Sequence, residues 1–194
     1  MSKVRLYLVR HGKTMFNTIG RAQGWSDTPL TAEGELGIHE LGIGLRESGL
    51  QFDRAYSSDS GRTIQTMGII LEELGLQGKI PYRMDKRIRE WCFGSFDGAY
   101  DGDLFMGLIP RIFNVDHVHQ LSYAELAEGL VEVDTAGWAE GWEKLSGRIK
   151  EGFEAIAKEM EEQGGGNALV VSHGMTIGTI VYPVSYTHLT LPTI

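Results

Sequence analysis

The chain has 194 residues, of which 42% are hydrophobic and 23% are charged. This length and composition are typical of a globular domain with its own core, and they exclude a disordered or fibrous protein. The formal net charge of −8 argues against a nucleic-acid-binding protein, because phosphate backbones bind basic surfaces. The single cysteine, Cys92, excludes an internal disulfide and fits a reducing compartment. Because there is no signal peptide and no apolar run of membrane-spanning length, we expect a cytoplasmic protein without a membrane partner.

The first half of the chain alternates strands with helices. Val4–Val9 is apolar and rich in β-branched residues, which indicates a strand buried on both faces, as in a parallel sheet. A polar, glycine-bearing loop is expected over residues 11–30. Thr31 is a candidate helix N-cap, and residues 58–60 offer another. We therefore predict helices over 31–48 and from about residue 60 to Gly75 or Gly78, and short strands over 52–57 and 80–83.

The second half contains an irregular stretch and the clearest helix. Residues 98–136 hold scattered glycines, Pro110 and short amphipathic pieces, which indicates an irregular insert. Large apolar residues then recur at intervals of three and four, which is typical of one long helix with a buried face. They are Trp138, Trp142, Leu145, Ile149, Phe153, Ile156 and Met160. Gly164–Gly166 ends this helix, and Ala168–Val171 is predicted to be a second buried strand. The alternation favours an α/β fold with a mostly parallel sheet and helices on both faces.

The end of the chain differs in character from the rest. Residues 184–194 read VSYTHLTLPTI and resemble the translation of a sequencing-library transposase adapter rather than evolved protein. We expect this segment to be a non-native tail that stands in place of the natural C-terminus. The alternative is a genuine final strand, because Thr, Tyr and Leu suit strands. The remaining residues, 1–183, are expected to form one domain, with 98–136 lying over its site.

Two similar motifs follow the two most strongly predicted strands. Arg10-His11-Gly12 comes directly after the first strand, and Ser172-His173-Gly174 comes directly after the later one. If these strands are parallel neighbours, both imidazoles lie at the same edge of the sheet, where open α/β folds bind ligands. Gly12 and Gly174 would let the backbone approach a bound group.

Further groups suited to an anion are expected at this edge. Arg62, in the first turn of the helix after Ser58, could deliver a guanidinium there, as could Arg10. Thr176 would begin a helix whose N-terminal amides favour an anion. Two arginines, two histidines and a helix terminus therefore predict a site for a dianionic phosphoryl group.

Histidines at such a site have a defined chemistry. A neutral imidazole can attack phosphorus and form a phosphohistidine, and a second, protonated histidine would hydrogen-bond the equatorial oxygens. The departing alkoxide needs a proton, so a carboxylic acid is required nearby. Glu90, in REWCFGSFDG, is the candidate.

Five blocks in series resemble the histidine phosphatase superfamily, the phosphoglycerate-mutase-like proteins. They are LVRHGKTMFN, GRAQGWSDTPLTAEG, SSDSGRTIQT, REWCFGSFDG and VVSHG, and their order matches along roughly residues 3–180. The resemblance implies a three-layer α/β/α sandwich and His11 as the phosphorylated nucleophile. It also implies roles for other residues in the blocks: Arg10, Arg62 and His173 as the phosphate pocket, Glu90 as the proton donor, and Asn17, Gln23 and Gly24 as contacts to phosphate or substrate.

The sequence also departs from the family's mutase branch. In that branch an Arg-His-Tyr-Gly run follows the acid, whereas here Glu90 is followed by Trp91-Cys92-Phe93-Gly94. The basic residues that clamp a second acidic group in the mutases have no clear counterpart in residues 98–120. We therefore predict a cofactor-independent phosphatase that acts on small phosphomonoesters. A phosphoglycerate mutase is the first alternative, and a catalytically silent module that binds a phosphorylated ligand is the second. The oligomeric state stays open, and further strand is expected beyond residue 183 in relatives.

His117 and His119 form one other histidine pattern in the sequence. His117 and His119 alternate as a metal-binding pair on a strand would, but no acidic or thiol partner is placed convincingly. We interpret them as parts of a solvated loop and predict no metal site.

Overall fold

The computed structural model describes residues 3–185 and their side chains as far as residue 181. Most of the segment 184–194 lies outside the described residues, so the interpretation of this tail as non-native stays a prediction.

A four-stranded parallel sheet lies at the centre of the fold. Its strands are β1 (Val4–Arg10), β2 (Arg54–Ser57), β3 (Tyr82–Met84) and β4 (Gly166–Ser172), in the spatial order β1-β4-β2-β3. Strands β1 and β4 pair in parallel over their whole length, with Arg10 opposite Ser172. The two motifs that each contain a histidine therefore follow neighbouring strand ends, as the sequence predicts.

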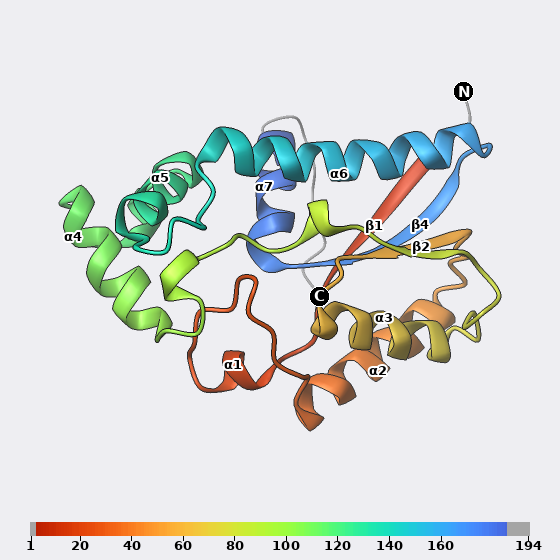
Figure 1. The fold of residues 1–194 in the computed structure, drawn as a ribbon. Coiled ribbons are helices and arrows are strands. Elements are labelled where there is room, and N and C mark those ends of the chain that lie inside the picture. The colour runs from red at the N-terminus through yellow and green to blue at the C-terminus, as the bar shows by residue number, and fades with distance from the viewer. Residues whose placement is uncertain (1–2, 186–194) are drawn as a thin grey trace.

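Helices cover both faces of the sheet: α6 (Trp142–Glu162) and α7 (Gly174–Ser185) lie on one side, and α2 (Ala32–Glu47) and α3 (Gly61–Glu73) lie on the other (Figure 1). The shorter helices α1 (Met15–Thr18), α4 (Ile109–Phe113) and α5 (Tyr123–Val133) lie outside these two layers. Local chemistry explains several of their starts. The Thr31 hydroxyl accepts from the amide of Gly34 at α2, and Ser122 forms a capping box with Glu125 at α5.

Alternation along β4 divides the interior into two cores. Ala168 and Val170 face α6, where they join the cluster that contains Ile149 and Phe153. Leu169 and Val171 point the other way, into a cluster with residues of α2 and α3. A strand with side chains of period two between two helical layers gives the three-layer α/β/α sandwich that the resemblance implies.

Two sequence predictions of burial are wrong. Strand β1 is only partly buried, because it lies at the edge of the described sheet and pairs with β4 alone; β4 is the strand buried on both faces. Trp138 precedes α6 and is 70% exposed, so it does not belong to the buried stripe that the spacing predicts. The other apolar residues of that stripe lie in α6 and face the core.

The stretch 98–136 is more regular than predicted. Most of it is helical, with a wide turn of π-helix over Gly102–Leu108, then α4, a 3₁₀ turn over Val118–Gln120, and α5. Asn114 ends α4 with a left-handed backbone, φ 50°. Because each piece is short, none shows a long periodic pattern, which is why the sequence indicates irregular structure.

Along residues 3–185, no helix combines the length and the apolar character that crossing a membrane requires.

Candidate active site

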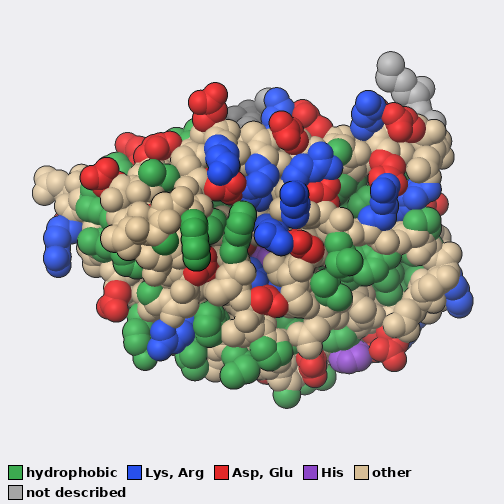
Figure 2. All heavy atoms as spheres, in the orientation of Figure 1, with side chains coloured by type: hydrophobic (Ala, Val, Ile, Leu, Met, Phe, Trp, Pro, Cys, Tyr) green, Lys and Arg blue, Asp and Glu red, His purple; other side chains and the backbone are tan. Residues whose placement is uncertain are grey.

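The two histidines meet where β1 and β4 end. The amide of His11 donates to the carbonyl of Ser172 at 3.0 Å, which extends the strand pairing by one residue. The imidazole of His173 follows on β4, and the centroids of the two rings are 5.3 Å apart. The overall charge is negative, yet Lys and Arg side chains gather over the central part of the face in Figure 2.

His11 is a buried, neutral imidazole, and within the described part of the chain only one of its ring nitrogens has a hydrogen-bond partner. Its Nδ1 lies 2.8 Å from the carbonyl oxygen of Gly12. A carbonyl only accepts hydrogen bonds, so Nδ1 carries the proton and Nε2 carries the lone pair. Burial, followed by the charge of Arg62, lowers the pKa of His11 to about 3. The ring is therefore neutral near neutral pH and chemically able to attack an electrophile.

Arg62 is a fully buried cation inside a shell of acceptors. Its Nη1 donates to the carbonyl of Ser26 at 2.9 Å and to Oδ1 of Asp27 at 2.7 Å. Its Nη2 donates to the carbonyl of Gly24 at 2.8 Å and contacts Nδ1 of His173 at 3.0 Å. Its Nε is buried without a hydrogen-bond partner among the described residues. A buried donor without an acceptor is costly, so this N–H is suited to an anionic ligand.

His173 differs from its predicted state. Its Nδ1 accepts from Arg62, and its Nε2 lies 2.8 Å from the hydroxyl of Ser58, so the ring is neutral and both nitrogens are engaged. Burial, followed by the charge of Arg62, holds the pKa of His173 well below its usual value. The prediction of a protonated His173 is therefore wrong for this arrangement, because a neighbouring buried guanidinium disfavours a second cation.

Glu90 occupies the N-terminus of α7. Its carboxylate accepts from the amides of Met175 and Thr176, at 3.1 and 3.0 Å, and from the Thr176 hydroxyl at 3.1 Å. Burial raises the pKa of Glu90, and the amide of Trp91 is the largest of the hydrogen bonds that oppose this rise. These amides were predicted to attract phosphate; instead they hold the carboxyl group that is the candidate acid.

The family model for the histidine phosphatase superfamily (branch 1) matches residues 6–191. The probable phosphoglycerate mutase GpmB of Salmonella choleraesuis is 32% identical over 180 residues, which are 92% of this chain and 73% of that protein. The chain belongs to the histidine phosphatase superfamily.

Solved structures agree with this assignment. The phosphoglycerate mutase from Bacillus anthracis str. Sterne superposes with a TM-score of 0.89 at 36% identity, and the match covers 98% of this chain and 84% of that one. Bacillus stearothermophilus YhfR superposes with a TM-score of 0.71 at 27% identity, covering 95% and 81% of the two chains. The α/β fold predicted from the sequence is therefore confirmed.

Three further predicted site residues hold loops of the protein together. Asn17 caps α1 through its Oδ1, which accepts from the amide and hydroxyl of Thr14. Gln23 is buried: its side-chain oxygen accepts a hydrogen bond from the Thr14 hydroxyl, and its side-chain nitrogen donates one to the Thr28 hydroxyl. Gly24 presents its carbonyl to Arg62, and a Cβ there would lie 2.3 Å from the carbonyl oxygen of Trp91. Their contact with a ligand stays a prediction.

Arg10 and Gly174 lie together at the rim. Arg10 is exposed at the end of β1, and a Cβ on Gly174 would lie 3.4 Å from the Nε of Arg10. The absence of a side chain on Gly174 leaves room for the guanidinium beside the first turn of α7. Arg10 is therefore an exposed cation at the same sheet edge as His11, and its contact with a ligand stays a prediction.

The predicted solvated character of the His117 and His119 segment is consistent with the structure. Both residues are exposed around the 3₁₀ turn at Val118–Gln120. Within residues 3–185, no group of three or more His, Cys, Asp or Glu side chains is arranged to hold a metal ion.

Asp97 is the residue that sequence reasoning missed. Its carboxylate accepts from the amides of Gly24, Trp25, Ser26 and Phe93 and from the Ser26 hydroxyl, at 2.8–3.3 Å. Because the carbonyls of Gly24 and Ser26 hold Arg62, Asp97 positions the acceptors around that cation. Its only sequence signal is a place in REWCFGSFDG, seven positions after Glu90, which says nothing of the distant loop that it holds.

We predict that Asp97→Asn lowers kcat/KM for 4-nitrophenyl phosphate by about 100-fold, since an amide nitrogen would face N–H donors and displace the loop around Arg62. Asp134→Asn is the matched control. Asp134 also accepts from several backbone amides, those of Ser95, Ala136 and Ala139 among them, but it does not hold the Arg62 loop. Equal losses in the two variants, or none in Asp97→Asn, would contradict the positioning role.

Proposed function

We propose that this protein is a phosphatase that hydrolyses small phosphomonoesters through a phosphohistidine on His11. The observation that carries the proposal is the state of His11: a neutral imidazole whose free Nε2 lies at the same strand edge as the buried Arg62. The Nε of Arg62, which has no hydrogen-bond partner among the described residues, supports an oxyanion as the ligand at this edge.

The proposed first step transfers the phosphoryl group to the protein. The lone pair on Nε2 of His11 attacks phosphorus, and the bond between phosphorus and the bridging oxygen breaks. Glu90 donates its proton to that oxygen, so the product is a neutral alcohol. Burial favours the protonated form of Glu90 that this step requires.

The second step restores the enzyme. Glu90, now a carboxylate stabilised by the α7 amides, accepts a proton from water as the water oxygen attacks phosphorus. The phosphorus–nitrogen bond breaks, inorganic phosphate leaves, and His11 returns to its neutral form. Arg62 and Arg10 would bind the charged oxygens in both steps. All these groups belong to this chain.

A phosphoglycerate mutase is the second candidate, because the relatives from Salmonella choleraesuis and Bacillus anthracis carry that name. A mutase must bind a second acidic group of its substrate while it holds the phosphoryl group. The residue after Glu90 is the buried Trp91, not a cation, and Arg111 is exposed on α4. These features favour transfer to water.

We expect wild-type protein treated with 4-nitrophenyl phosphate and quenched in alkali to carry an acid-labile phosphate on His11, located by mass spectrometry. His11→Ala should carry none. His39→Ala, a change on the outer part of α2, is the matched control and should label like wild type. A folded wild-type sample that neither labels nor turns over would refute the enzyme proposal. Label that moves to phosphoglycerate but not to water would replace the phosphatase with the mutase.

A second prediction separates the roles of Glu90 in the two steps. In Glu90→Gln, 4-nitrophenyl phosphate should still release about one equivalent of nitrophenolate in a burst, since this leaving group needs no proton. The following turnover, and all turnover of butyl phosphate, should fall by about 100-fold or more. Glu154→Gln, on the exposed side of α6, serves as the control. Loss of the burst together with the steady state would argue against Glu90 as the acid.

A further inference from the structure

A cavity of about 670 Å³ lies between the stretch that contains α4 and α5 and the start of α7. This volume is typical of small-molecule sites. Most of its lining is apolar. The apolar side chains are Phe105, Met106, Val118, Leu121, Leu126 and Met175. His11 and His173 do not line this cavity, so it is a compartment beside the proposed phosphate site.

Met175 joins this compartment to the candidate acid. Its amide donates to the Glu90 carboxylate at 3.1 Å, while the same residue lines the cavity. Tyr123, also in the lining, packs edge-on against Trp91 with ring centroids 5.5 Å apart. Burial and then the nearby charge of Glu90 raise the pKa of Tyr123. The wall of the cavity therefore begins at the residues around Glu90.

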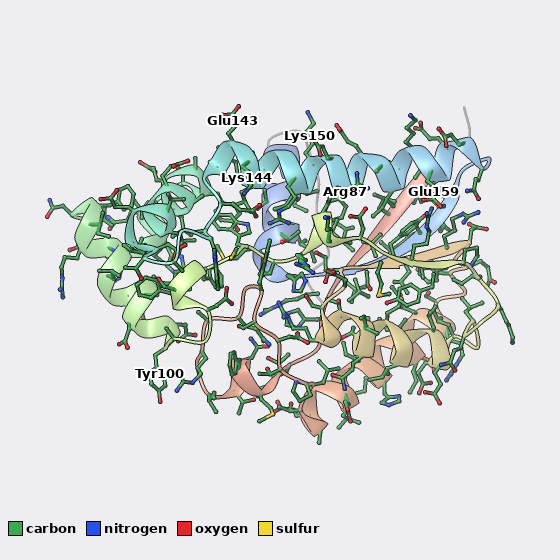
Figure 3. All side chains as sticks on the ribbon, viewed as in Figure 1. Arg87, Tyr100, Glu143, Lys144, Lys150 and Glu159 are labelled. Carbon is green, nitrogen blue, oxygen red and sulfur yellow. The ribbon has the colours of Figure 1, made fainter. Side chains whose placement is uncertain are left out.

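The polarity of the lining matters for the ligand. The polar lining residues are Asp101, His119, Ser122 and Tyr123, and the lining of described residues holds no Lys or Arg. The nearby Arg21 is committed elsewhere, since it donates to the carbonyl of Gly98 and lies over the ring of Tyr100. Lys150 projects from the outer side of α6 (Figure 3). A carboxylate in this cavity would face Asp101 and, among the described lining residues, no Lys or Arg.

The contact between the cavity wall and Glu90 relates the cavity to the leaving alcohol. In the proposed reaction, Glu90 must contact the oxygen that bridges phosphorus and the alcohol. The phosphoryl group lies toward His11, so the alcohol lies on the side of Glu90 away from the imidazole. The cavity begins at Met175, the residue whose amide donates to the Glu90 carboxylate.

We propose that this cavity binds the alcohol half of the substrate, and that the natural substrates are phosphate monoesters of uncharged, largely apolar alcohols. The inference rests on the proposed phosphatase function and adds the substrate class. Burial of each additional methylene in an apolar pocket favours the transition state of the longer ester.

The test is a series of alkyl phosphates with nearly equal leaving-group basicity: methyl, butyl and hexyl phosphate. We expect kcat/KM, measured by phosphate release, to rise by about tenfold or more from methyl to hexyl phosphate. 3-Phosphoglycerate should react no faster than methyl phosphate. A flat series, or 3-phosphoglycerate as the best substrate, would overturn the inference while leaving a phosphatase in place. No turnover of any ester would instead refute the proposed function.

Variants of Leu121, a half-buried residue of the lining, locate the effect. Leu121→Lys should reduce the hexyl-to-methyl ratio of kcat/KM by about tenfold, and the milder Leu121→Ala should reduce it by about threefold. In both variants, methyl phosphate hydrolysis should stay within about twofold of wild type. Val131→Lys, on the exposed side of α5, should keep the wild-type ratio. An unchanged ratio in Leu121→Ala would overturn the assignment even if Leu121→Lys failed to fold.

Discussion

The burial of the Arg62 guanidinium is the constraint on which the rest of the site depends. A charge removed from water is tolerated only when hydrogen-bond acceptors surround it. The carbonyls of Gly24 and Ser26 and the carboxylate of Asp27 supply these acceptors. They hold the loop of residues 24–27 around the guanidinium at the start of α3, and Asp97 binds the backbone amides of the same loop.

The same cation contributes, after burial, to the protonation state of both histidines. Its charge adds to burial in lowering the pKa of His11 and of His173, so both rings are neutral. Positive charge at the site therefore resides on arginine, and imidazole is left free for nucleophilic chemistry. Glu90 lies in a different environment, at the N-terminus of α7, where it can hold a proton and yet be stabilised after losing it. In the proposed mechanism, phosphate binding, attack and proton transfer therefore belong to three different elements.

Local patterns predicted the parts of this arrangement that depend on short stretches of chain. The strand ends at Arg10 and Ser172, and the N-cap at Thr31, follow from residue type and spacing alone. The contacts that decide function join distant segments: Asp97 with Gly24, Glu90 with Met175, and His173 with Arg62. Periodicity carries no information on such pairs. The cavity escaped prediction for the same reason, since its walls come from short helices that show no long pattern.

The central claim is that His11 is a neutral imidazole with its proton on Nδ1 and its lone pair on Nε2. Nitrogen NMR of protein labelled in its histidine rings, titrated with acid and assigned through His11→Ala, tests this most directly. The account predicts that the His11 ring keeps the Nδ1-protonated neutral form through pH 6.5, the ordinary histidine pKa, and gains a second proton only near about pH 3. A His11 that titrates near 6.5, or whose neutral form carries its proton on Nε2, would contradict it.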